Sequence, residues 1–318
     1  MRLEAPIRTS LVVSLHIAKH EALDVAEKLL LPSIYQNASG WLEVIIVDDC
    51  SPMEKETESL ISRYREELIP KAGEFKHIKN KKRLGIGGSY NRGIQTTDGK
   101  VIIIANSDVY FPKNSLASLS TNTLAGQDVG AVGPVTNSTW SYQNTSLFPK
   151  LKNYSEEELT KIEKFAAWLR KVMGGQTCKI VGNMGDIFGF CMSFSRDIIR
   201  EVGDFDPRFK MGYFEDTDLN RRIRKAGYSI ILDKSTFVEH GGVTGASVSF
   251  NQYPIESTIA KLRNAWEYAK KWNCYIELPF ELIRDASQGN DRHTVTDEIV
   301  ITAKEKGLWE EYLQIGIK

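Results

Sequence analysis

Cysteine, net charge and long apolar runs are all scarce in this sequence, and each scarcity excludes a class of protein. The 318 residues include 4 cysteines and no Cys-x-x-Cys pair. We therefore expect free thiols in a reducing compartment rather than a disulfide frame or a zinc knuckle. The 41 basic and 41 acidic side chains balance. A protein that binds nucleic acid usually carries a basic excess, so we expect no nucleic-acid partner.

Long apolar segments are also missing. No run approaches the roughly 20 residues that cross a bilayer, and the N-terminal MRLEAPIRTS lacks the apolar stretch of a secretory signal. With 42% apolar and 26% charged residues, the chain has the composition of an ordinary globular protein. We expect it to be cytoplasmic.

Short apolar runs alternate with amphipathic segments through the first 135 residues. This alternation, with nearly continuous apolar strands, predicts an α/β fold whose mostly parallel sheet is covered by helices on both faces. The expected strands are Leu11–Leu15, Val44–Val47, Phe75–Ile78, Val101–Ala105 and Val129–Val135. The expected helices are Glu21–Tyr35, Glu54–Leu68, Gly87–Thr96 and Asn114–Leu124.

The pattern becomes less regular after residue 136. A capping box of Ser155 and Glu158 predicts a helix that runs to Met173. The segment 241–254 is rich in Gly and Ser and is expected to be a mobile loop, and the chain is expected to be helical from Ile255 onward. The other expected elements are strands at 186–194, 229–232 and 237–240 and a helix at 215–225.

Polar side chains follow two of the buried strands. Asp48-Asp49 comes after one strand, and Asn106-Ser107-Asp108 comes after another. The carboxyl ends of parallel strands meet at one edge of the sheet, where ligands bind, so these carboxylates should share one rim. Each alone could be an Asx-turn or a helix N-cap. Two acidic strand ends on one sheet favour a ligand site.

A glycine-rich stretch, RLGIGGSYNRG at 83–93, follows the third strand. The dinucleotide motif Gly-x-Gly-x-x-Gly would need glycine at position 90, which is Tyr90, so that motif is absent. Glycines that open a helix still allow a diphosphate or a sugar to approach the backbone amides.

The acids Glu215 and Asp216 begin a predicted helix directly after the aromatic pair Tyr213-Phe214. The helix dipole favours acids at a helix start. A carboxylate beside aromatic surface also has a raised pKa, which suits it to take a proton from a hydroxyl.

Two histidines end predicted strands. A lone histidine is more often structural, and we interpret His16 in that way. His240 differs because Asp108 lies on a nearby rim, and an aspartate with a histidine can hold a hard divalent cation such as Mn²⁺ or Mg²⁺.

Seven motifs, in order and at suitable spacing, resemble the GT-A-fold glycosyltransferases of family 2, especially their bacterial rhamnosyltransferase-like branch. The resemblance extends from about residue 11 to 242. It rests on VIIVDDCS (44–51), NKKRLGIGGSYNRGI (80–94), IIIANSDVYFP (102–112), VGPVTNS (132–138), GFCMSFSRDIIREVGDFDPRF (189–209), GYFEDTDLNRRIRKAGY (212–228) and VEHGG (238–242). It implies a GT-A fold with a Rossmann-like sheet.

The resemblance implies a role for each matched position. Asp48 and Asp49 would bind the nucleobase and ribose of a nucleotide-sugar donor. The triplet Asn106-Ser107-Asp108 matches the Asp-x-Asp motif of the family with Asn in place of the first Asp, so metal and ribose contacts depend on Asp108. The loop against nucleotide and sugar would be formed by Arg83, Gly85, Gly88 and Asn91.

The remaining matched positions concern the metal and the acceptor. His240 would be a further metal ligand, and Asp216 would be the general base, with Glu215 as the alternative. The implied catalytic domain is 1–254, with a nucleotide-binding half at about 1–135 and an acceptor half at about 136–254. A helical C-terminal extension would follow at 255–318.

The implied reaction moves a sugar from a UDP- or dTDP-sugar to a saccharide or lipid-linked saccharide acceptor, with inversion. The setting would be the synthesis of a cell-surface polysaccharide or glycoconjugate, in the cytoplasm or at the inner face of the cell membrane. The loop at 241–254 would close over the donor. The C-terminal extension could pack on the core, form a homodimer face or make peripheral contact with a membrane.

Two other functions stay open. A catalytically inactive module could retain the fold and bind a nucleotide sugar or a carbohydrate. A sugar nucleotidyltransferase would carry a Gly-rich basic loop after its first strand, where this sequence has HIAKHEAL.

Overall fold

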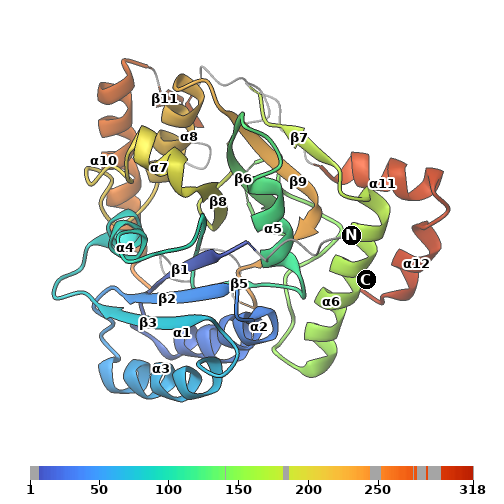
Figure 1. Cartoon of the computed structure of the whole chain (residues 1–318), viewed down its shortest axis with the longest axis horizontal. Helices are drawn as coiled ribbons and strands as arrows, with labels where there is room; N and C mark the ends of the chain where they lie inside the picture. The colour runs from blue at the N-terminus through green and yellow to red at the C-terminus, as the bar shows by residue number, and fades with distance from the viewer. Residues whose placement is uncertain are drawn as a thin grey trace.

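A large central sheet organises the chain (Figure 1). The computed structural model describes residues 7–139, 141–181, 186–243, 252–274, 276–277, 284–285 and 295–317. The sheet has eight strands in the order β3-β2-β1-β4-β8-β6-β9-β7. Their bounds are β1 Thr9–Leu15, β2 Leu42–Asp48, β3 Glu74–Lys79, β4 Val101–Ala105, β6 Val129–Val135, β7 Thr177–Lys179, β8 Cys191–Ser195 and β9 Ser229–Phe237.

Most strands of this sheet run in one direction. β1 pairs in parallel with β2 and β4, β2 pairs in parallel with β3, and β6 does so with β9. β8 is antiparallel to both β4 and β6, so these two strands also share a direction. Strands β1, β2 and β4 are almost wholly buried, as expected for parallel strands covered on both faces. The predicted α/β fold with a mostly parallel sheet is confirmed.

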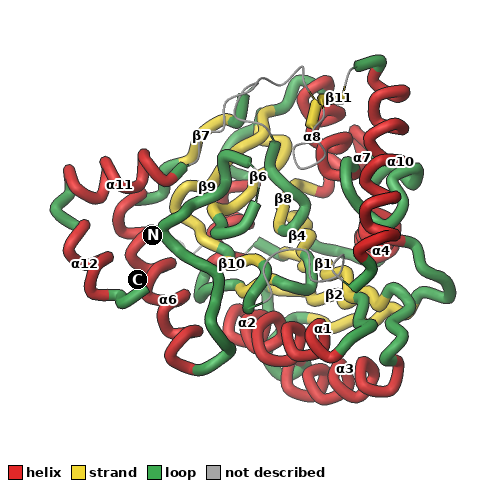
Figure 2. The backbone as a smooth tube through the Cα atoms, turned by 180° about the vertical axis from the view of Figure 1, so that it is seen from behind, coloured by secondary structure: helices red, strands yellow, loops and turns green. Residues whose placement is uncertain are grey.

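Helices lie on both sides of the sheet. Figures 1 and 2 both show α1, α2 and α3 on one side of β1–β3 and α4 on the other. α4 lies close to β1 because Gly93 has no side chain: a Cβ there would be 2.2 Å from a Val12 methyl group. The helices are α1 His20–Val25, α2 Leu31–Asn37, α3 Glu54–Leu68, α4 Gly85–Ile94, α5 Ser115–Thr123, α6 Glu156–Met173, α7 Arg196–Val202, α8 Glu215–Lys225, α10 Pro254–Trp272, α11 Thr296–Glu305 and α12 Trp309–Gln314.

Several predicted boundaries are wrong. The helix expected at 21–35 runs from His20 to Asn37 and contains a π-helical turn at Ala26–Leu30. Pro32 follows that turn, and proline cannot donate to the preceding turn of a regular helix.

The predicted capping residue of α6 is confirmed, because the Ser155 hydroxyl accepts from the Glu158 backbone amide.

The strands of the second half also differ from the prediction. The strand expected at 186–194 begins only at Cys191, so Gly189 lies in a turn. The two strands expected at 229–232 and 237–240 are one strand, β9, followed by the short β10 at Glu239–His240. The polar residues in the middle of β9 are the reason that two separate strands were expected there. Asp233 is nevertheless buried, and its carboxylate accepts from Asn122 at 2.8 Å.

The C-terminal helices pack in two separate places (Figure 1). α10 lies beside α8, whereas α11 and α12 pack against α6. There the Trp168 indole donates to the Leu308 carbonyl at 2.8 Å, and the Tyr312 hydroxyl donates to the Leu147 carbonyl at 2.9 Å. Within the described ranges, no helix is long and apolar enough to cross a membrane.

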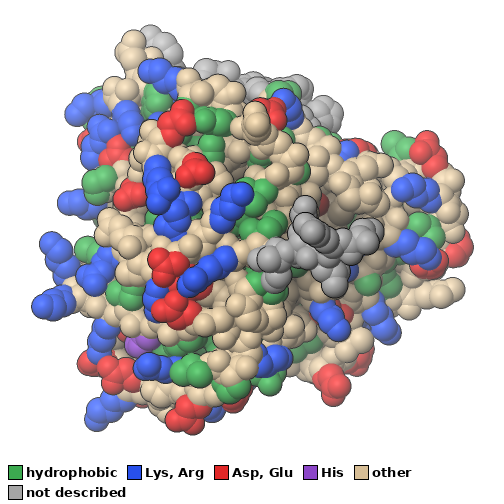
Figure 3. Space-filling view, in the orientation of Figure 1, with side chains coloured by type: hydrophobic (Ala, Val, Ile, Leu, Met, Phe, Trp, Pro, Cys, Tyr) green, Lys and Arg blue, Asp and Glu red, His purple; other side chains and the backbone are tan. Residues whose placement is uncertain are grey.

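Charges of both signs are interspersed over the face drawn in Figure 3. This distribution agrees with the formal net charge of zero. Of the predicted mobile loop at 241–254, residues 244–251 lie outside the described part of the chain.

Candidate active site

A narrow cleft opens at the carboxyl edge of β1, β2 and β4. It joins the two acidic strand ends that the sequence places on one rim. Its walls also include the start of α4 and one residue from the loop before α8. The lining residues are Ser14, His16, Asp49, Arg83, Gly85, Ile86, Asn106, Ser107, Asp108 and Met211.

The two aspartates after β2 have different surroundings. The Asp49 carboxylate accepts from the backbone amides of Leu84 and Gly85, at 2.7 and 2.8 Å, and from the Asn80 side chain at 2.8 Å. It therefore fixes the loop that opens α4. Asp48 is fully buried: one oxygen accepts from the Ser51 amide at 2.9 Å. The other oxygen, Oδ2, has no hydrogen-bond partner among the described residues.

A two-stranded ribbon brings Asp108 and His240 together. β5, at Val109–Tyr110, pairs antiparallel with β10, and His240 lies opposite Val109. The Gly241 amide donates to the Asp108 carbonyl at 2.7 Å. As a result, Asp108 Oδ1 lies 3.5 Å from His240 Nε2, and both side chains are buried.

The surroundings of His240 fix which ring nitrogen faces Asp108. Nδ1 lies 2.8 Å from the Ser138 carbonyl, which can only accept, so Nδ1 carries a proton. Phe190 stacks on the ring with centroids 4.7 Å apart. Burial alone would lower the pKa of His240, but Asp108 and the Ser138 carbonyl raise the pKa overall.

The pair fits a divalent cation. A carboxylate oxygen and an imidazole nitrogen face each other, and both can act as ligands. The bond from Nδ1 to a backbone carbonyl is the usual support for a metal-binding histidine. The Asn106 amide, whose Nδ2 lies 3.5 Å from His240 Nε2, completes this side of the cleft.

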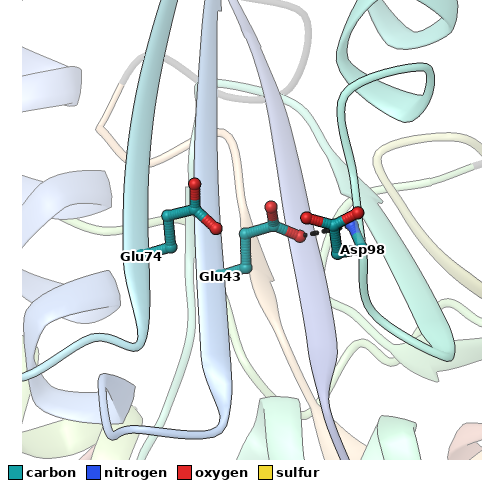
Figure 4. A group of neighbouring side chains, drawn as sticks. All are labelled: Glu43, Glu74 and Asp98. Atoms are coloured by element: carbon teal, nitrogen blue, oxygen red, sulfur yellow. Dashed lines mark hydrogen bonds between the residues drawn. The ribbon is translucent and has the colours of Figure 1, made fainter.

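A second acidic cluster lies at the opposite edge of the sheet. Glu43, Glu74 and Asp98 point toward one another (Figure 4), and in the described ranges they form the only group of three with metal-ligand spacing. The Lys76 ammonium lies 2.7 Å from Glu43 and 3.3 Å from Glu74, and Arg8 pairs with Glu74. Because Lys76 and Arg8 already pair with these three carboxylates, we interpret the cluster as a structural ion-pair network.

Glu215, which is buried, and Asp216, which is partly exposed, form an acid pair at the start of α8. Asp216 accepts from the backbone amides of Gly189 and Thr217 at 2.8 and 2.7 Å. Glu215 Oε2 has no hydrogen-bond partner among the described residues. Burial raises the pKa of both carboxyls, and their proximity raises the pKa of Glu215 further. The two amide donors favour the charged form of Asp216, whereas burial and the neighbouring Asp216 favour the protonated form of Glu215.

A short series of close polar contacts lies between the acid pair and Asn106. The Gly189 amide donates to Asp216, and the Gly189 carbonyl lies 3.1 Å from the Tyr90 hydroxyl. The same hydroxyl lies 2.9 Å from Asn106 Oδ1. Gly189 thus lies between the acid pair and the Asp108 side of the cleft.

The loop that precedes the acid pair has strained backbone. Residues 211–214 all have positive φ, at 68°, 146°, 73° and 71°, and only Gly212 is a glycine. Such conformations cost about 1 kcal/mol or more each for other residues. The fully buried Asn264 of α10 places its Nδ2 3.0, 2.6 and 3.1 Å from the carbonyls of Lys210, Gly212 and Tyr213. α10 therefore holds the loop in place.

The predicted donor-loop residues do not all line the cleft. Arg83 and Gly85 do so, whereas Gly88 and Asn91 do not. Of the other predicted donor-binding residues, Asp49 and the triplet 106–108 line the cleft, whereas the fully buried Asp48 does not. The Asn91 side chain bonds both backbone groups of Phe205, at 2.8 and 2.9 Å. The roles of Gly88 and Asn91 in donor binding remain predictions.

Sequence reasoning missed three residues at the cleft. His16, interpreted as structural, lies there with Nδ1 2.8 Å from the Asp49 carbonyl and Nε2 3.2 Å from the Tyr253 hydroxyl. The Arg83 guanidinium stacks on the Tyr253 ring at 4.4 Å. Met211 joins the lining because Gly85 leaves room for it: a Cβ at Gly85 would be 2.4 Å from the Met211 amide nitrogen. No local pattern marks Tyr253 or Met211.

Comparisons with known proteins show the family and the fold of the chain. The sequence model of the family described as glycosyl transferase family 2 matches residues 27–203, more than half of the chain. No curated protein sequence matches the chain.

Two solved structures are similar in fold. A mannosyltransferase from Pyrobaculum calidifontis, PcManGT, in complex with GDP-Man and Mn²⁺, has 16% identity and a TM-score of 0.52, over 98% of this chain and 83% of its own. GalNAc-T7 with UDP, GalNAc and Mn²⁺ has 13% identity and a TM-score of 0.52, over 96% of this chain and 55% of its own. The match to both extends over nearly all of this chain.

Proposed function

Because the chain belongs to glycosyl transferase family 2, we propose that its cleft transfers a sugar from a UDP- or dTDP-sugar to an acceptor hydroxyl with inversion. One observation carries the proposal. The Asp108–His240 pair and the acid pair Glu215–Asp216 lie on either side of Gly189, whose amide donates to Asp216 and whose carbonyl lies 3.1 Å from the Tyr90 hydroxyl beside Asn106. A site for a leaving diphosphate and a site for a general base are thus neighbours across one short segment.

The donor side of the cleft fits a nucleotide. The resemblance assigns Asp48 to the nucleobase, and its Oδ2 has no hydrogen-bond partner among the described residues, but Asp48 is fully buried beneath the cleft lining, so a base would reach it only after the cleft opens. Asp49 holds the loop whose Gly85 backbone lines the cleft, and Arg83 adds a positive charge there. The roles of Gly88 and Asn91 would be to hold this loop and α4 in place.

Asp108 and His240 would hold Mn²⁺ or Mg²⁺. The bound cation would supply positive charge against the negative charge that develops on the departing diphosphate. Both similar structures named above were solved with Mn²⁺, which supports a divalent metal for this site.

Asp216 is the proposed general base. Its carboxylate takes the proton from the acceptor hydroxyl as the new carbon–oxygen bond forms and the bond to the diphosphate breaks. Glu215, whose pKa is raised by burial and by Asp216, would keep its proton, and Asp216 would carry the charge. Attack from the face opposite the leaving group inverts the anomeric carbon.

The substrates are proposed from the sequence resemblance and the chemistry. The ligands of the similar structures are GDP-Man in one, and UDP and GalNAc in the other. For this chain, the rhamnosyltransferase-like motifs favour dTDP-rhamnose, while UDP-hexoses are chemically equivalent at the diphosphate. A saccharide or lipid-linked saccharide is the proposed acceptor, in cell-surface polysaccharide or glycoconjugate synthesis at the cytoplasmic side.

Calorimetry with a panel of nucleoside diphosphates and nucleotide sugars, with and without Mn²⁺, tests the proposal. We expect one base to bind, Mn²⁺ to tighten binding, and Asp108→Ala to remove the metal effect. Lys55→Glu on α3, an exposed charge change away from the cleft, is the control. Absence of binding under every condition contradicts the proposal. Metal-dependent binding without donor turnover would favour the inactive binding module.

A further inference from the structure

Helix α10 has two faces with different tasks. Its inner face holds the strained loop before the acid pair through Asn264 and buries Ser257, Ala260 and Tyr268. The opposite face exposes large apolar side chains. These are Ile255, Ile259, Leu262 and Trp266, which are 71%, 58%, 46% and 66% exposed.

The four side chains form one stripe. At 3.6 residues per turn they lie within an arc of about 60°. Their spacings of 4, 3 and 4 residues are those of the a and d positions of a heptad repeat, the pattern by which one helix packs against another. Figures 1 and 2 both show α10 at the outer edge of the molecule.

We propose that this stripe is a self-association surface and that a second copy of this chain covers it, with the two α10 helices antiparallel about a twofold axis. In this register Ile255 of one copy lies opposite Trp266 of the other, and Ile259 lies opposite Leu262. Each of these residue pairs then occurs twice, once on either side of the twofold axis, as an isologous contact requires.

Charge complementarity supports the antiparallel arrangement. Glu256 and Arg263, both exposed, occupy e positions beside the stripe. In an antiparallel pair, e positions face e positions, so Glu256 of each copy meets Arg263 of the other. Two reciprocal ion pairs result. The opposite flank carries the exposed Thr258, which is small enough to allow close approach.

The charges on the flank that carries Glu256 and Arg263 argue against a lipid surface as the occupant. Arg263 and Lys270 lie there, but so do Glu256 and Glu267. The charges of this flank cancel, whereas helices that bind anionic membranes carry a basic excess beside their apolar face. Of the other two basic residues of α10, Lys271 already pairs with Asp206 and Asp218 of this chain, and Lys261 lies on the other side of the helix. The inference does not depend on the proposed reaction, because it concerns the outer face of α10 alone.

Sedimentation velocity over a concentration series tests the proposal. Four side chains per copy form a small interface, so we expect a reversible dimer in the micromolar range. Trp266→Glu should weaken it by about a hundredfold or more, since an unpaired carboxylate would be buried. Circular dichroism checks that each variant is folded.

A charge-swap cycle tests the register. Glu256→Arg and Arg263→Glu should each weaken the dimer by about threefold to tenfold, because each places like charges opposite one another. The double variant should restore most of the affinity. Lys55→Glu on α3 should leave it unchanged.

Three results would overturn the proposal. The first is a monomer at every concentration, and the second is a dimer that is unaffected by Trp266→Glu. The third is a monomer that floats with phosphatidylglycerol-containing vesicles and loses this binding in Trp266→Glu, since a lipid surface would then be the occupant. A charge-swap double variant no better than the single variants would contradict the antiparallel register.

Discussion

Asn264 offers the sharpest test of how α10 supports the acid pair. Its amide lies within hydrogen-bonding distance of three carbonyls and can satisfy two of them at once. Removing it in Asn264→Ala leaves at least two carbonyls short of a donor, at about 1–3 kcal/mol each when buried. Some relaxation reduces the total, so we expect the free energy of unfolding to fall by about 2–4 kcal/mol.

Asn264→Asp should be worse than Asn264→Ala. A carboxylate would face carbonyl oxygens with no proton to donate, so repulsion adds to the lost bonds. Urea unfolding measures the free energy, and turnover with a saturating donor measures the effect on the acid pair. Thr258→Ala, on the exposed side of the same helix, is the matched control. The reasoning fails if Asn264→Ala costs less than about 0.5 kcal/mol or if the aspartate variant is the more stable of the two.

Two further predictions concern the acid pair. In Gly189→Ala the new Cβ would lie 3.3 Å from the Asp216 Cβ and 3.4 Å from its Oδ2. Because this crowds the proposed base, turnover should fall by about tenfold, while nucleotide affinity measured by calorimetry should be unchanged. Equal losses of turnover and nucleotide affinity would contradict this prediction. The pKa of Glu215 is raised by burial and by Asp216, so the folded state favours the protonated form and loses stability as the pH rises above the ordinary carboxyl range. Glu215→Gln should therefore stabilise the protein more at pH 8 than at pH 5 in urea titrations, and an equal effect at both pH values would refute the assignment.

The sequence predicted the strands that lead to the cleft because their cause is local. Val44–Val47 and Val101–Ala105 are apolar throughout, and both lie in fully buried strands. Acids after such strands have to emerge at the carboxyl edge, whichever neighbours the strands take. The general position of Asp49 and Asp108 could therefore be predicted.

What could not be predicted depends on contacts between distant segments. The insertion of β8 between β4 and β6 follows from sheet pairing and not from the residues of β8. Gly189 was expected inside a strand, but its turn conformation lets its amide reach Asp216. Likewise, His16 has no partner nearby in sequence, because the hydroxyl that contacts it belongs to Tyr253.

The pairing of His16 with Tyr253 has a consequence for how the protein is made. The two residues are 237 positions apart, and contacts of such long range form late because a large loop must close first. At about 5–20 residues per second of synthesis, α10 emerges roughly 10–30 s after β4. During that interval the growing chain carries its first acidic strand ends but lacks the helix that holds the loop before the acid pair. The cleft of a growing chain is therefore incomplete until α10 has been synthesised and has packed against this loop.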